Sequence, residues 1–249
     1  MKNNQHGLTP LMTRRKHRRS VQPPSSAAGV FAAAKKRYIE SSSVVDQKAG
    51  FELLRTAAEL GSIRAHEWLG YVYDYGYGTR TNRPLSFRHY LIAAKAGNAN
   101  AEYHVGVFYH EGIAVRKNYR AAVAWFKRAA KHGDATALHC LGQACRYGWG
   151  VRKNVKKGFK LELQAAQMGD REAQYSVGVC FSRGEGTAPD PEEAFRWYLR
   201  AARRGDRDAA HNVAYFYGIG RGTRQDKKKA EFWRTRASQP SSPYPAAKR

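Results

Sequence analysis

The sequence predicts an all-α fold, an α-solenoid of helix-turn-helix units wound into a right-handed superhelix. One observation is a period of 36 residues, visible in a glycine register at Gly70, Gly106, Gly142 and Gly178. A second is that apolar residues within a unit recur at helical spacing rather than in alternation. A third is that one such unit is too small to bury its own apolar face, so successive units must stack.

The period divides the chain into three parts. Residues 1–43 form a basic N-terminal tail that is predicted to be mostly disordered, with a short helix near residues 27–40. Residues 44–237 form the solenoid, which opens with the second helix of a unit and continues through five full units. Residues 238–249 contain several Pro and Ser residues and are predicted to be disordered.

Each full unit carries start and stop signals for two helices. Residues able to cap the first helix of each unit are Ser62, Asn98, Asp134, Asp170 and Asp206. Glycines able to end it through a positive φ are Gly76, Gly112, Gly148, Gly184 and Gly220. Residues able to cap the second helix are Asn82, Asn118, Asn154, Asp190 and Asp226. A further glycine lies inside the first helix, for example Gly106, and because it costs about 1 kcal/mol there it indicates close backbone packing against another helix.

These residues resemble the Sel1-like repeat, a relative of the tetratricopeptide class. In the central unit the pattern is matched by Ala101, Val105, Gly106, Tyr109, Gly112, Val115, Asn118, Ala122, Trp125, Phe126, Ala129, Ala130 and Gly133. The third full unit departs most, since Gly158, Leu161 and Glu162 replace the alanine and the aromatic pair. The resemblance implies a non-enzymatic protein-interaction scaffold or adaptor, and it names no partner.

The first helices are expected to line the concave side, where a peptide or protein partner would bind. Their outward stripe contains the candidate partner-binding residues Tyr71, Tyr75, Tyr103, His110, His139, Arg146, Tyr147, Tyr175, Arg183, His211 and Tyr215. The alternative is that several of these side chains pack against the first helix of the next unit.

The net charge of +24 and the pI near 10.2 favour acidic proteins, nucleic acid or anionic membrane surfaces as partners. The alternative function is therefore the binding of nucleic acid or another polyanion, with candidate residues Arg196, Arg200, Arg203, Arg204 and Arg207. Arg196, Arg200, Arg203 and Arg207 recur at helical spacing and are expected to form one ridge. A solvated basic face explains the same residues, and it also explains the basic arm at residues 13–20.

The sequence offers no arrangement for catalysis, a metal or a cofactor. It has no G-x-S-x-G, no P-loop and no H-E-x-x-H motif, and the recurring G-x-G belongs to the loop of every unit. His139, Cys140 and Cys145 do not have the spacing of a zinc site, and Cys145 and Cys180 fall on core registers. The three cysteines have no regular spacing, which argues against a disulfide framework. The sequence also has no apolar run of about 18 residues and no evident signal peptide. Together these features predict a cytoplasmic protein.

Overall fold

The structure, a computed structural model, describes residues 26–40 and 43–238. Over these residues the chain forms twelve α-helices and no strand. The helices are α1 (Ala27–Glu40), α2 (Val44–Glu59), α3 (Ile63–Tyr75), α4 (Arg83–Lys95), α5 (Ala99–Glu111), α6 (Tyr119–Lys131), α7 (Ala135–Tyr147), α8 (Val155–Gln167), α9 (Arg171–Arg183), α10 (Pro191–Arg203), α11 (Arg207–Ile219) and α12 (Lys227–Ser238). The expectations for residues 1–25 and 239–249 lie outside the described residues.

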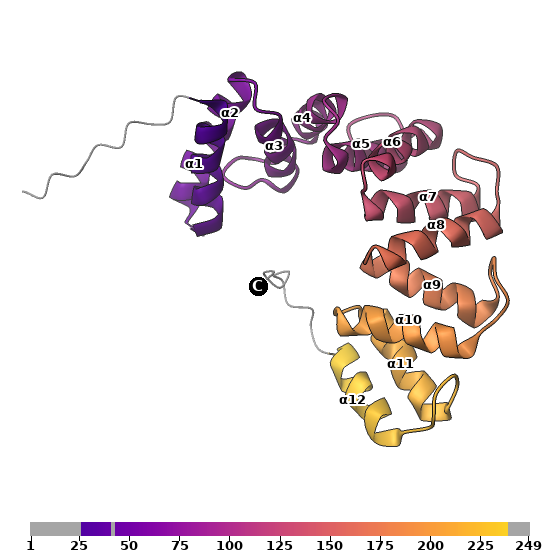
Figure 1. The fold of residues 1–249 in the computed structure, drawn as a ribbon. Coiled ribbons are helices and arrows are strands. Elements are labelled where there is room, and N and C mark those ends of the chain that lie inside the picture. The colour runs from indigo at the N-terminus through magenta and orange to yellow at the C-terminus, as the bar shows by residue number, and fades with distance from the viewer. Residues whose placement is uncertain (1–25, 41–42, 239–249) are drawn as a thin grey trace, which may run out of the picture.

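The helices pack in sequence order, each mainly against its neighbours in the chain. Figure 1 shows them following one another along an open arc, from α1 at one end to α12 at the other. The α-solenoid that the period predicts is thus confirmed. None of the described helices has the length and hydropathy needed to cross a membrane.

The predicted caps set the helix boundaries. At the start of α5, Asn98 Oδ1 accepts a hydrogen bond of 2.8 Å from the backbone N–H of Ala101. At its end, Gly112 has a φ of 77° and its N–H donates to the carbonyl of Phe108. The same two devices bound α3, α7, α9 and α11. Because every first helix starts and stops at the same register, each unit presents the same faces to its neighbours.

The glycine inside the first helix makes room for a ring on the second helix. A Cβ atom added at Gly106 would lie 2.5 Å from Cε1 of Phe126, and one added at Gly178 would lie 2.6 Å from Cδ1 of Tyr198. The register does mark a close contact with the second helix, but the predicted backbone contact is wrong in these units, because the glycine faces a ring.

Helix α1 supplies the first helix for the half unit that opens the array. Its residue Tyr38 lies so close to Gly50 of α2 that an added Cβ would be 2.9 Å from Cε2 of the ring. Phe31 packs edge-on against Trp68 of α3, with ring centroids 6.1 Å apart. This helix therefore closes the N-terminal end of the core, although its sequence does not follow the 36-residue pattern.

The third full unit, α7 and α8, replaces the ring with a buried ion pair. Glu162 stands at the register of Phe126 and Tyr198 and is fully buried. Arg146 of α7, only 6% exposed, places Nη1 3.1 Å from Glu162 Oε2. Arg146 also contacts Glu185, and the Cys180 thiol donates to Glu162 Oε2 over 3.6 Å. Burial raises the pKa of Glu162, while Arg146 opposes that shift.

Two imidazoles meet between α3 and α4. The Nδ1 atoms of His66 and His89 are 2.9 Å apart, and the His89 ring also stacks on Tyr73. Burial, the neighbouring His66 and Arg88 lower the pKa of His89 to about 4, and burial lowers the pKa of His66. The folded protein therefore favours the neutral rings.

This pair predicts a loss of stability in mild acid. The unfolded chain binds protons at histidine near pH 6.5, whereas folded His89 does so only near pH 4. The free energy of unfolding should therefore fall as the pH drops from about 6.5 to about 4. Urea unfolding at pH 7.5 and pH 5 should show a smaller fall for His89→Gln than for the wild type. Equal falls in the two proteins would contradict the prediction, because carboxylate protonation affects both alike.

Candidate functional site

The candidate surface consists of side chains that the first helices direct outward at equivalent positions. Tyr71 of α3 and Tyr215 of α11 occupy one register of the repeat, and they are 42% and 54% exposed. Tyr75 and Tyr147 occupy a second register one turn further on, and they are 56% and 53% exposed. Because equivalent positions of stacked units lie along one face of a solenoid, these tyrosines share a face.

Three tyrosines gather at the end of α3. The ring centroid of Tyr71 lies 4.7 Å from that of Tyr75 and 5.6 Å from that of Tyr77, and Tyr75 and Tyr77 are 6.0 Å apart. All three are exposed. Partial burial and the neighbouring Tyr77 and Tyr75 raise the pKa of Tyr71 to about 12, so this hydroxyl stays protonated at neutral pH. We call Tyr71, Tyr75 and Tyr77 the tyrosine triad.

A second aromatic group joins α5, α6 and α7. Trp149 stacks on Tyr147 with ring centroids 4.9 Å apart, and its ring also lies 5.2 Å from that of His110 and 6.1 Å from that of Tyr119. Trp149 is half-buried, whereas Tyr147 remains exposed. We call His110, Tyr119, Tyr147 and Trp149 the tryptophan group.

Sequence reasoning missed Tyr77 and Trp149, yet the two occupy the same register. Each is the residue between the two glycines of the loop, in Gly76-Tyr77-Gly78 and in Gly148-Trp149-Gly150. Both loop glycines have a positive φ, so the loop follows the same path in both units. An aromatic residue between the two glycines of the loop was the available signal.

Two candidate residues are interior residues, which corrects the expectation that they face outward. His139 is 3% exposed and Arg146 is 6% exposed. His139 Nδ1 has no hydrogen-bond partner among the described residues, and Arg146 is held by Glu162 and Glu185. Neither side chain is available to a partner on this surface.

Some of the other candidate partner-binding residues pack against neighbouring helices, and others are exposed to solvent. Tyr103 packs against Phe126, with ring centroids 6.1 Å apart, and Tyr175 packs against Tyr198 at 5.8 Å. These two half-buried rings pack inside the solenoid, as the alternative interpretation of the stripe predicts for several of its residues. Arg183, His211 and Tyr215 are exposed.

The predicted arginine ridge is wrong for Arg207. Helix α10 ends at Arg203, and Arg207 begins α11 after the turn that contains the capping residue Asp206. Its Nε donates to the carbonyl of Ala237, and Arg204 donates to the carbonyl of Gly169. Gly205 between the two helices adopts a φ of 88°, which interrupts the helical spacing.

The arginines on α10 itself are exposed but already have neighbours. Arg196 forms ion pairs with Glu193 at 2.6 Å and with Glu192 at 3.6 Å. The Arg200 guanidinium lies 4.4 Å from the ring centroid of Trp197. These contacts are typical of a solvated helix face.

The described residues contain no group of three or more His, Cys, Asp or Glu side chains that could hold a metal ion. Cys145 and Cys180 are buried, and Cys140 is half-buried. Burial raises the pKa of Cys140 and of Cys180 to about 12, so both remain protonated thiols.

The chain is similar to known proteins over most of its length. The Sel1 repeat pattern matches residues 41–62, 63–98, 99–134, 135–170, 171–206 and 207–239. Among solved structures, the Sel1 repeat protein from Oxalobacter formigenes is 28% identical with a TM-score of 0.73, over 84% of this chain and 82% of that chain. No curated protein matches.

Two further solved structures share the fold. A protective antigen of uropathogenic Escherichia coli strains, described as displaying an SLR fold, is 26% identical with a TM-score of 0.77. The alignment covers 86% of this chain and 46% of the antigen. An immunity protein from Pseudomonas aeruginosa is 17% identical with a TM-score of 0.56, over 87% of this chain and 83% of that one, and shows the fold alone.

Proposed function

The chain belongs to the Sel1 repeat family, and on this premise we propose that it is a non-enzymatic scaffold that binds a protein or peptide partner along the face formed by its first helices. The observation that carries the proposal is the pair of aromatic clusters, the tyrosine triad and the tryptophan group. Tyr75 and Tyr77 of the triad occupy the same registers as Tyr147 and Trp149 of the tryptophan group, two units apart. A partner lying along the array would therefore contact both.

Exposed aromatic side chains suit this role for physical reasons. Tyr and Trp bring a large contact area with few rotatable bonds, and they are enriched among the residues that dominate binding energy. Mutual stacking restricts the rings before a partner arrives, so less side-chain entropy is lost on binding. The solenoid beneath them is ordered as well, so most of the ordering falls on the partner.

We predict that removing the exposed rings abolishes capture of the partner. The test variant is Tyr71→Ser/Tyr75→Ser/Tyr147→Ser, compared with the wild type by affinity capture from a lysate of the source cell. Aromatic residues of this kind contribute about 2 kcal/mol or more each when they anchor an interface, so partner recovery should fall at least tenfold. Proteins captured equally by the wild type and the triple variant would contradict the proposal.

The matched control is Phe232→Ser, which removes a ring that is 57% exposed on the solvent side of α12. This variant should retain the partner. Half of each sample is treated with nuclease and washed at moderate salt. If all protein partners vanish under that treatment while nucleic acid is found in the untreated half, the basic charge binds a polyanion and the scaffold proposal fails.

A further inference from the structure

A cavity of about 600 Å³ opens between α6, α7, α8 and the loop that joins α7 to α8. Its floor is apolar and buried, formed by Val123, Leu141, Ala144 and Cys145, which are each less than 9% exposed. Val151 and Leu161 complete the apolar wall. A concave apolar site of this size is large enough to enclose an aromatic side chain.

The cavity exists because this unit lacks an aromatic pair that the other units have. At the registers of Val123 and Cys145 the other units place two rings packed edge to face. These pairs are Phe51 with Tyr73, Phe87 with Tyr109, Phe159 with Phe181, and Phe195 with Tyr217, at centroid distances of 5.5, 5.7, 5.3 and 5.0 Å. Leu161 similarly stands at the register of Trp125 and Trp197. The cavity therefore occupies the space that aromatic rings fill in the other units.

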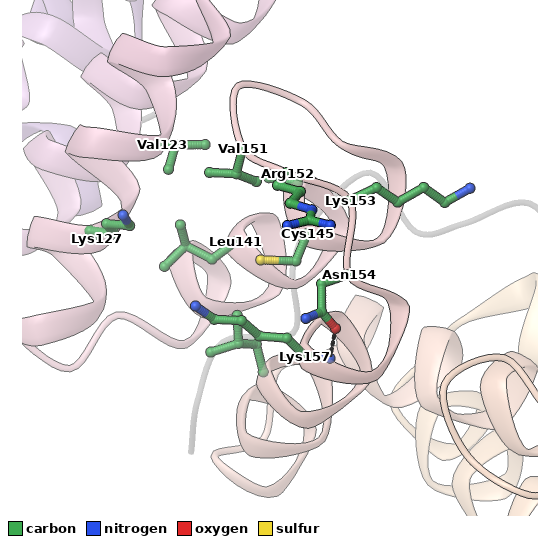
Figure 2. Close-up of a pocket in the computed structure, with 11 residues that line it drawn as sticks. Val123, Lys127, Leu141, Cys145, Val151, Arg152, Lys153, Asn154 and Lys157 are labelled. Carbon is green, nitrogen blue, oxygen red and sulfur yellow. Dashed lines mark hydrogen bonds between the residues drawn. The ribbon is translucent and has the colours of Figure 1, made fainter.

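The mouth of the cavity is positively charged. Lys127, Arg152, Lys153 and Lys157 line it, all four are exposed, and no acidic side chain is among the lining residues. Figure 2 shows Lys127 coming from α6, Lys157 from α8 and Arg152 from the loop, around the apolar floor, whereas the side chain of Lys153 extends away from it. The first turn of α8 also carries no acidic residue that would balance the positive end of its dipole.

We propose that this cavity is a second binding site, which takes an aromatic side chain from an acidic segment of a partner protein. The space left by the missing rings fits an aromatic anchor, and Lys127, Arg152 and Lys157 around it favour acidic residues on either side of that anchor. Because the cations stand on three separate elements, they match several carboxylates spaced along a peptide better than one carboxylate on a small molecule.

The site is separate from the surface assigned to the scaffold function. On α7, Leu141, Ala144 and Cys145 line the cavity, whereas Tyr147 lies about 120° around the helix from Leu141 and does not line it. None of the residues that line the cavity belongs to the tyrosine triad or to the tryptophan group. Either site can therefore be removed without the other.

The probe is the fluorescein-labelled heptapeptide EDEFDED, titrated with the full chain and followed by anisotropy at 50 mM NaCl. We expect saturable binding with a Kd below about 1 mM. Replacing the phenylalanine by alanine should weaken binding at least tenfold, because burial of the ring drives insertion. No saturable binding up to about 1 mM, or equal binding of both peptides, would overturn the proposal.

Two sets of variants test the two halves of the site. Val123→Phe/Cys145→Tyr installs the rings that the other units carry, so it should fold and weaken binding at least tenfold. Leu161→Trp fills the same space if the double variant fails to fold. Arg152→Gln/Lys153→Gln should weaken binding and reduce its salt dependence, whereas Arg116→Gln/Lys117→Gln, at the same register one unit earlier, should not. Undiminished binding by a folded, filled variant would refute the site.

Two further arms separate this proposal from its competitors. Free 2-naphthoate is titrated as well, and tighter binding of this acid than of the peptide would make the cavity a small-molecule site and overturn the peptide proposal. The scaffold variant Tyr71→Ser/Tyr75→Ser/Tyr147→Ser should bind the peptide as the wild type does. Loss of peptide binding in that variant would show that the peptide occupies the aromatic face instead of the cavity.

Discussion

Replacing Arg146 with methionine is expected to lower the free energy of unfolding by about 3–5 kcal/mol, the usual cost of removing one partner of a buried ion pair. Glu162 is fully buried, and Arg146 donates to both of its carboxylate oxygens. Without the guanidinium, the Cys180 thiol would be the one remaining donor to that carboxylate among the residues that the structure describes. Urea unfolding followed by circular dichroism measures the loss.

The control is the double variant Arg146→Met/Glu162→Leu, which removes both charges and keeps similar volumes. It should recover most of the loss and come within about 1 kcal/mol of the wild type, since apolar replacements of buried ion pairs are often neutral or better. If the double variant is no more stable than Arg146→Met, the loss reflects packing by the arginine stem and not an unpaired carboxylate.

The single variant should also respond to pH in a specific direction. Burial raises the pKa of Glu162, and in Arg146→Met the main opposing charge is gone. A carboxyl group whose folded pKa lies above its unfolded value stabilises the fold below the unfolded pKa, and this contribution is lost as the pH rises through the folded pKa. The deficit relative to the wild type should therefore be smaller at pH 5 than at pH 8.

The ion pair shows where the sequence was informative and where it was not. The sequence marked Gly158 and Glu162 as departures from the pattern, but it placed Arg146 on the outer stripe. A Cβ at position 158 would lie 2.4 Å from Cγ of Arg146, so Gly158 makes the room that lets this arginine lie against α8 and reach Glu162. The departures are coupled across two helices. Periodicity describes single positions and cannot show that coupling.

The repeat predicted helix boundaries well because these depend on local chemistry. A cap such as Asp134 needs only its own side chain and the next backbone N–H groups, and a glycine such as Gly148 needs only its own φ. Exposure depends on neighbouring units instead. Tyr147 remains exposed while Tyr103 is half-buried against Phe126, although both belong to the predicted stripe. The aromatic surface was therefore predictable as a face, but not residue by residue.

Gly106→Ala is expected to lower the free energy of unfolding by about 2 kcal/mol, although alanine is the better helix former. The added Cβ would lie 2.5 Å from the ring of Phe126, which is only 2% exposed and packed within the core. Overpacking of this kind costs about 1–3 kcal/mol, which exceeds the gain of about 1 kcal/mol in helix propensity. Urea unfolding of the full chain measures the difference.

The sign of this effect should reverse when the ring is removed. Phe126→Ala alone should cost about 3–5 kcal/mol, because it opens a cavity against α5. In that background the Cβ at position 106 enters empty space, so Gly106→Ala should stabilise the protein by about 1 kcal/mol. Destabilisation by Gly106→Ala in both backgrounds would mean that the glycine serves the backbone of α5 itself. A reversal would show that α5 keeps Gly106 to make room for the ring of Phe126 that it faces.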